Sequence, residues 1–179
     1  MYQKLLLPVD GSTTSNRGLE EAISLAKLTG GSVRLVHVVD ELSFSIAAGS
    51  YGGYTGDLLD VLREGGAEIL EQAKKTVAAA GLPVETVLHE TLTGSVADMV
   101  TTEAANSGAD LIVLGTHGRR GVGRMILGSS AESILRYAPV PVLLVRSPDV
   151  KPVKAAKKAT HDFIDPVRVN LTSGGNSIE

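Results

Sequence analysis

Five short apolar runs, separated by longer amphipathic segments, constrain the fold of this chain more than any other feature of its sequence. The runs cover residues 4–9, 32–39, 84–89, 110–115 and 140–145. Four of them are almost continuously apolar, which is typical of parallel strands covered on both faces. The run at 84–89 alternates apolar and polar residues, so we expect that strand nearer an edge of the sheet.

The segments between the runs carry apolar residues at helical spacing. They predict helices over residues 15–28, 58–80, 95–105 and 129–137, with a long glycine-rich loop over 41–57. Strands joined by helices are parallel, and their crossovers are right-handed. We therefore predict an α/β fold: a doubly wound, five-stranded parallel sheet in the order 3-2-1-4-5, with helices on both faces in a Rossmann-like or flavodoxin-like three-layer sandwich.

The composition indicates one core and excludes several classes of function. For 179 residues with 43% hydrophobic content, we expect one domain over 1–146 and a poorly ordered C-terminal extension over 147–179. A net charge of -3 lacks the basic footprint of a nucleic-acid binder. The absence of cysteine excludes disulfides and thiolate metal sites. The chain has no secretory or membrane-spanning apolar stretch, so we expect a cytoplasmic protein without membrane insertion.

A glycine-rich run over 111–130 follows the fourth predicted strand and carries the most chemical information. Gly115, Gly118, Gly128 and Ser129 form the pattern G-x2-G-x9-G-S. Glycine lets backbone N–H groups approach a ligand closely, and a helix start directs unpaired N–H groups at the same point. Arginine donors, which suit phosphate oxygens, lie within the run at Arg119, Arg120 and Arg124. The run predicts a phosphate site; the alternative is an ordinary loop with turn glycines and solvated arginines.

A second polar turn, over residues 8–12, follows the first predicted strand. In the order 3-2-1-4-5, strands one and four flank the point where the strand order reverses. Ligands of such sheets bind there, beyond the carboxyl ends of the strands. We therefore expect the turn at 8–12 and the glycine run to form one crevice, although Asp10 has the alternative role of capping its own turn.

Other familiar site types do not fit the sequence. The glycine run has no lysine, which excludes a P-loop, and the first strand is not followed by the GxGxxG of dinucleotide-binding folds. Histidines in the second and third strands, His37 and His89, are interpreted as structural, and His117 as an exposed loop residue. We assign no catalytic residue and no metal ligand.

Landmarks in four parts of the chain together resemble the universal stress protein family over residues 1–146. They are Asp10 at the end of strand one, His37-Val38 late in strand two, the run GTHGRRGVGRMILGSS, and the closing PVPVLLVR. The resemblance implies an adenine-nucleotide-binding domain of the ATP-binding branch. It also implies a homodimer in which strand 140–145 pairs with its twofold mate.

The resemblance further implies a nucleotide site. Pro8 and Val9 would line its entry, Asp10 would bond the ribose or the nearby ring edge, and Val38 would pack on adenine. Beneath the ribose would lie Leu114 and Gly115. The phosphates would contact Gly118, Arg119, Gly128, Ser129 and Ser130.

The function implied is that of an ATP-binding universal stress protein, a nucleotide-dependent sensor or regulator in the stress response. Its cofactor would be ATP with magnesium (Mg) arriving on the ligand, since the sequence has no carboxylate cage. Two alternatives stay open: a slow ATPase or phosphotransfer protein, and a regulatory module for AMP or cyclic AMP. Binding is favoured over turnover because Asp10 and His117 are the only candidates for a general base near the phosphates, and neither is evidently positioned to activate water. The sequence does not specify a protein partner.

Overall fold

The computed structural model describes residues 1–40, 56–91, 94–116 and 127–146. Within them the strands are β1 (Lys4–Pro8), β2 (Ser32–Asp40), β3 (Val84–Thr91), β4 (Leu111–Gly115) and β5 (Val142–Val145). The helices are α1 (Thr13–Thr29), α3 (Gly56–Ala79), α4 (Val96–Ser107) and α5 (Ser129–Tyr137). The predicted strands and helices are present, and their ends differ from the predicted ends by a few residues. The expected loop at 41–57 and extension at 147–179 lie, apart from residues 56 and 57, outside the described residues.

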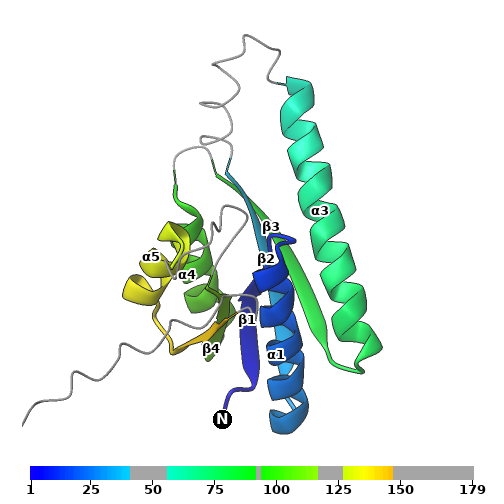
Figure 1. Cartoon of the computed structure of the whole chain (residues 1–179), viewed down its shortest axis with the longest axis vertical. Coiled ribbons are helices and arrows are strands. Elements are labelled where there is room, and N and C mark those ends of the chain that lie inside the picture. The colour runs from blue at the N-terminus through cyan, green and yellow to red at the C-terminus, as the bar shows by residue number, and fades with distance from the viewer. Residues whose placement is uncertain (41–55, 92–93, 117–126, 147–179) are drawn as a thin grey trace, which may run out of the picture.

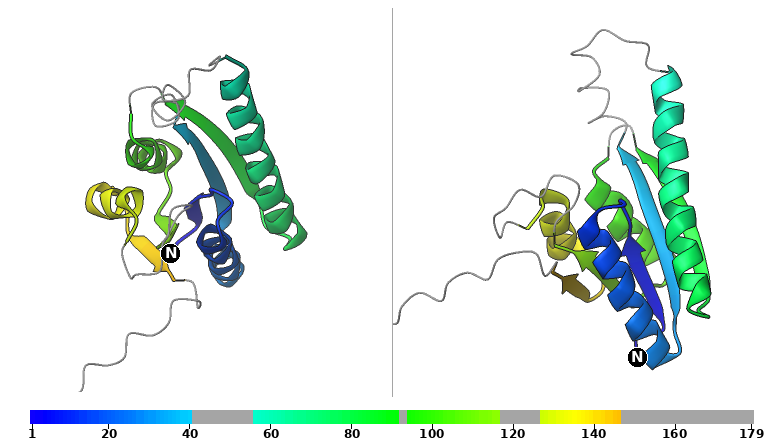
Figure 2. Two further views of the ribbon diagram at one scale, coloured as in Figure 1. Left: turned by 45° about the horizontal axis from the view of Figure 1, so that its top comes forward. Right: turned by 45° about the vertical axis from the view of Figure 1, so that its right-hand side comes forward.

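The sheet has the order β3-β2-β1-β4-β5, and every pair of neighbouring strands is parallel. Helices α1 and α3 cover one face of the sheet, and α4 and α5 cover the other (Figures 1 and 2). The prediction of a doubly wound, three-layer α/β fold is therefore confirmed, as is the edge position of β3. The strand order reverses between β1 and β4, whose carboxyl ends point toward the same edge.

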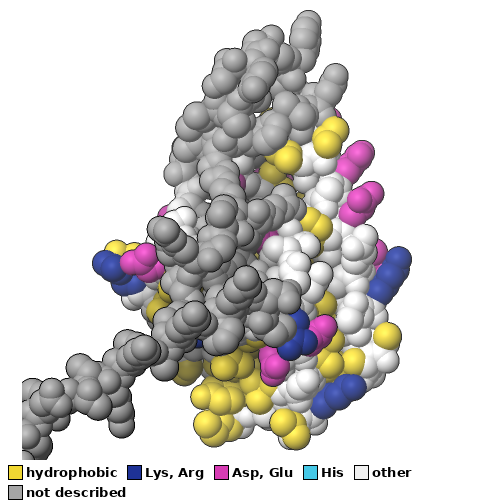
Figure 3. Space-filling model, viewed as in Figure 1, with side chains coloured by type: hydrophobic (Ala, Val, Ile, Leu, Met, Phe, Trp, Pro, Cys, Tyr) yellow, Lys and Arg dark blue, Asp and Glu magenta, His cyan; other side chains and the backbone are white. Residues whose placement is uncertain are grey.

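Two apolar cores hold the layers together, one on each face of the sheet. In β1, Leu5 and Leu7 pack toward α1 and α3, whereas Leu6 packs toward α4 and α5. Successive strand residues point to opposite faces, so a strand covered on both sides needs apolar residues without interruption. All three leucines have 0% of their surface exposed, and each such burial contributes about 2 kcal/mol. Figure 3 shows lysine, arginine and carboxylate side chains on the outer surface of the described residues.

Serines determine where α1 and α4 begin. The Ser12 hydroxyl accepts a hydrogen bond from the Ser15 N–H, so α1 starts at Thr13, before the first apolar residue of the helix. Ser95 and Asp98 cap α4 reciprocally, each side chain accepting from the other residue's N–H at 3.1 Å. Hydrogen bonds from the Ser95 side chain and backbone hold the pKa of the Asp98 carboxyl below its ordinary value.

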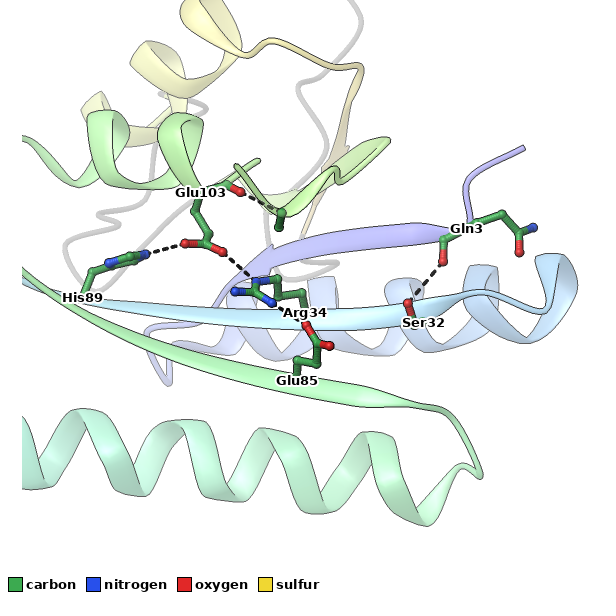
Figure 4. Close-up of polar contacts among 7 residues, drawn as sticks. Gln3, Ser32, Arg34, Glu85, His89 and Glu103 are labelled. Carbon is green, nitrogen blue, oxygen red and sulfur yellow. Dashed lines mark hydrogen bonds and ion pairs between the residues drawn. The ribbon is translucent and has the colours of Figure 1, made fainter. Parts of the chain in front are cut away.

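A buried carboxylate ties α4 to the two strands at the β3 edge (Figure 4). Glu103 on α4 accepts from Arg34 Nε of β2 at 2.6 Å and from His89 Nε2 of β3 at 2.8 Å. Burial alone lowers the pKa of Arg34, but its hydrogen bonds and charge contacts with Glu103 and Glu85 raise that pKa above its ordinary value. His89 therefore contacts a carboxylate within the fold, in line with its interpretation as a structural residue.

Candidate functional site

At one edge of the sheet, the end of β4 makes a close backbone contact with the start of α1, the helix that follows β1. Gly115, the last residue of β4, lies against the first turn of that helix. A Cβ atom at this position would lie 2.7 Å from the Thr14 carbonyl oxygen and 3.2 Å from the Ser15 nitrogen. A side chain would prevent this approach, so glycine is required here for packing. Two segments far apart in the sequence are thereby brought together where the strand order reverses.

The turn between β1 and α1 is held by its own polar groups. Asp10 Oδ1 accepts from the Ser12 N–H at 2.9 Å, and the Ser15 hydroxyl accepts from the Asp10 N–H at 3.3 Å. Gly11 has a φ of 76°, in the left-handed region that glycine tolerates best. The capping contact considered for Asp10 is therefore present, and it fixes one carboxylate oxygen. Ligand binding by Asp10 stays a prediction.

Helix α5 begins at the same edge. The N–H of its N-cap residue, Gly128, donates to the Thr116 carbonyl at 3.2 Å, which links the helix start to the residue after β4. The N-cap residue of α5, Gly128, has no side chain to cap the helix, in contrast to Ser12 of α1 and Ser95 of α4. The N–H groups of a helix's first turn carry the positive end of its dipole and suit an anion. Ser129 and Ser130 stand in that turn and are exposed.

The described members of the predicted site divide into two groups. Those with at least partly exposed surface at this edge are Pro8, Asp10, Gly115, Gly128, Ser129 and Ser130. By contrast, Val9 and Leu114 are only 5% and 6% exposed and pack into the two cores. Their side chains are therefore committed to the fold. Val38 is half-buried on the α4 and α5 face, two residues beyond Val36, the register partner of Pro8. Gly118 and Arg119 lie outside the described residues.

The fold places further polar residues at this edge, none of which was predicted to contact the ligand. They are Ser12, Thr14, Ser15 and Thr116. The hydroxyls of Ser12 and Thr14 lie 3.2 Å apart, and Thr14 and Thr116 are buried. The run GSTTS directly after Asp10 contained the signal, because serine and threonine before a helix are typical caps. With Ser12 as its cap, α1 begins at Thr13 rather than at the predicted residue 15, so the helix starts directly at the site.

The described residues contain no cluster of three or more histidine and carboxylate side chains arranged to hold a metal ion. In the same part of the chain, no helix combines the length and apolar character needed to cross a bilayer.

The model of the universal stress protein family matches residues 1–146. The chain belongs to the universal stress protein family. This match covers all the described strands and helices, including both segments that meet at Gly115.

Relatives of this universal stress protein are similar over most of their length. Universal stress protein MJ0531 of Methanocaldococcus jannaschii is 36% identical over 149 residues, which cover 83% of this chain and 84% of the relative. A solved structure of a universal stress protein from Burkholderia pseudomallei has 31% identity and a TM-score of 0.66, over 82% of this chain and 97% of that one. The solved structure of MJ0577 has 27% identity and a TM-score of 0.70, with the same coverage of 82% and 97%.

Two more distant structures share the fold and are complexes with adenine nucleotides. A universal stress protein from Archaeoglobus fulgidus was solved with dAMP, at 24% identity and a TM-score of 0.58, over 80% of this chain and 98% of that one. Another universal stress protein was solved with cAMP, at 23% identity and a TM-score of 0.57, over 81% and 97% of the two chains.

The contact at Gly115 yields a prediction about stability. We expect Gly115→Ala to lower the free energy of unfolding by about 2 kcal/mol, because the added methyl group would meet the Thr14 backbone rather than a movable side chain. Gly128→Ala is the matched control, since no atom in the described part of the chain lies within 4 Å of a Cβ at that position. Urea unfolding of both variants tests the contact. Equal stabilities would show that β4 and α1 are not closely packed at this point.

Proposed function

We propose that this universal stress protein binds an adenine nucleotide at the edge where β1 and β4 end, with ATP and its magnesium as the ligand. Its role is that of a nucleotide-dependent sensor or regulator in the stress response. One observation carries the proposal: the packing of Gly115 on α1 brings the Asp10 turn and the start of α5 to one edge of the sheet. That edge is where doubly wound sheets bind their ligands.

Each side of this edge suits a different part of the nucleotide. On the β1 side, the Asp10 carboxylate accepts hydrogen bonds from ribose hydroxyls, and Pro8 and Val38 border the sugar and base. On the β4 side, Gly115 lies beneath the ribose, and the N–H groups and hydroxyls of Ser129 and Ser130 bind phosphate at the start of α5. The side chains of Val9 and Leu114 are buried, so these two residues act by shaping the strand ends. The sequence adds Gly118 and Arg119 to the phosphate side.

The complexes of two family members with dAMP and cAMP support an adenine nucleotide as the ligand class. The dipole of α5 and the arginines of the glycine run favour a ligand with several phosphates. In the alternative module, AMP lacks those outer phosphates, and cyclic AMP in addition has its single phosphate closed onto the ribose 3′ oxygen.

Binding is favoured over turnover by the chemistry of the described site. Among the described residues assigned to it, Asp10 is the titratable one, and its Oδ1 already accepts from the Ser12 N–H at 2.9 Å. This hydrogen bond commits Asp10 Oδ1 to holding the turn, so that oxygen is less available to take a proton from an attacking water. We therefore favour a sensor over a slow ATPase or phosphotransfer protein.

Nucleotide extraction tests the proposed function. The protein is purified as expressed, incubated with magnesium, denatured, and its supernatant is chromatographed. We expect ATP that persists during the incubation. Conversion of ATP to ADP would support the slow ATPase, and recovery of AMP or cyclic AMP would support the regulatory module for those nucleotides. Recovery of no nucleotide, together with no heat of ATP binding in calorimetry, would contradict the proposal.

A substitution at Gly128 tests the phosphate side. Gly128 has φ -60° and ψ 147°, angles that valine also adopts, and no atom of the described residues lies within 4 Å of a Cβ there. We expect Gly128→Val to fold normally and to bind ATP at least about tenfold more weakly, because its side chain would occupy the space of the phosphates. The control is Gly65→Ala on α3, where nothing lies near the added Cβ. Calorimetry showing equal ATP affinity for Gly128→Val and the wild type would remove Gly128 from the site.

We also propose that the protein is a homodimer joined through β5. This strand lies at the edge of the sheet, and its Leu143 and Leu144 are 38% and 37% exposed. An edge strand with exposed leucines favours pairing with another chain. Pairing of β5 with its twofold mate would cover these leucines.

Introducing a positive charge on this surface tests the dimer. We expect Leu143→Arg to yield monomers in light scattering, because the new charges would face each other across the paired strands. Leu28→Arg places the same charge at a leucine of α1 that is 85% exposed, and this control is expected to remain dimeric. A soluble Leu143→Arg dimer would argue against pairing through β5.

A further inference from the structure

A buried histidine holds the backbone that leads into the Asp10 turn. His37 of β2 is 7% exposed, and its Nδ1 lies 2.6 Å from the Val9 carbonyl oxygen. Because a carbonyl only accepts, Nδ1 donates this hydrogen bond. The Val9 N–H in turn donates to the Val36 carbonyl at 2.8 Å. Both backbone polar groups of Val9 are thus bonded to β2, directly before Asp10.

Helix α3 packs against this histidine at Gly66. A Cβ at Gly66 would lie 2.7 Å from His37 Cδ2 and 3.0 Å from Leu88 Cδ1. Glycine weakens a helix interior relative to alanine, and at position 66 of α3 the close packing gives a reason for it. The imidazole of His37 provides it, because the ring occupies the space where a side chain of α3 would otherwise stand.

A second contact joins α3 to the same turn. Ile69 lies three residues beyond Gly66, on the same side of the helix. Its side chain packs on Gly11, where an added Cβ would be 3.4 Å from Ile69 Cδ1. Helix α3 therefore contacts the Asp10 turn directly at Gly11 and indirectly through the ring of His37.

We propose that His37 is a positioning residue of the nucleotide site and that it links nucleotide binding to the packing of α3. By holding the Val9 carbonyl under α3, His37 fixes where the Asp10 turn begins. A displacement of α3 from the ring releases the turn and lowers the affinity for the nucleotide. Linkage is reciprocal, so bound nucleotide also stabilises α3 on the sheet. The inference rests on the proposed function and identifies α3 as the helix that responds to the ligand.

The variants that test this role separate hydrogen bonding from packing. His37→Leu removes the donor to Val9, whereas His37→Asn keeps an amide donor near the Nδ1 position. Gly66→Ala keeps the histidine and presses on its ring from α3, so it serves where His37→Leu does not fold. Val77→Ala is the structural control: Val77 is fully buried on the same helix, eleven residues away from Gly66 and about 16 Å along the helix axis.

Two measurements are made on each variant: ATP affinity by calorimetry, and amide hydrogen exchange over residues 10–15 without nucleotide. We expect His37→Leu and Gly66→Ala to bind ATP about tenfold more weakly and to exchange faster over 10–15. His37→Asn is expected to stay within about threefold of the wild type. Val77→Ala is expected to unfold more easily but to keep its ATP affinity and its exchange over 10–15. In the wild type, ATP is expected to slow exchange in α3 around Gly66.

Three results would count against the proposal. Unchanged ATP affinity in His37→Leu and Gly66→Ala would overturn it, and equal affinity losses in those variants and in Val77→Ala would reduce His37 to a packing residue. A wild-type protein that binds no nucleotide would refute the proposed function and the linkage with it. In that case, faster exchange over 10–15 in His37→Leu would still show that His37 positions the turn. Failure of the proposed function can therefore be distinguished from failure of the role of His37.

Discussion

The close approach of the Gly115 backbone to the first turn of α1 is the contact on which the rest of this structure depends. The pairing of β1 with β4 brings these strands together, but helix α1 can reach the end of β4 only where residue 115 has no side chain. The contact fixes how far the first turn of α1 extends along the sheet. It therefore also places the Asp10 turn at the same edge as Thr116 and the start of α5.

The fold could be predicted from the sequence because burial on both faces leaves a clear pattern. Leu5, Leu6 and Leu7 have no polar residue among them, since each side of β1 is covered by helices. The alternation in β3 correctly indicated an edge. Helix starts were harder to predict, because apolar periodicity begins only at residues that face the core. Helix α1 begins earlier, at Thr13, where the Ser12 hydroxyl provides the cap.

The candidate site could be predicted only in outline. Sheet topology alone places Asp10 and Gly115 at one edge, so the convergence of their segments followed from the strand order. What each residue contributes could not be predicted, because it depends on contacts between distant parts of the chain. Nothing in the sequence indicated that both backbone groups of Val9 are bonded to β2, or that His37 lies between that backbone and Gly66. Contacts between such distant residues do not repeat at a regular spacing, so they leave no periodic pattern in the sequence.

Backbone amide chemical shifts of the isotope-labelled protein, followed during titration with ATP and magnesium, test the central claim most directly. A nucleotide held at the strand reversal changes the shifts over residues 10–15, at Gly115 and Thr116, and over 128–131, in one saturable process. The amides of β3 and those at the amino ends of the strands stay nearly constant. Saturable shifts confined to another surface, such as the β3 edge near Glu103 and His89, would contradict a site between the two segments that meet at Gly115.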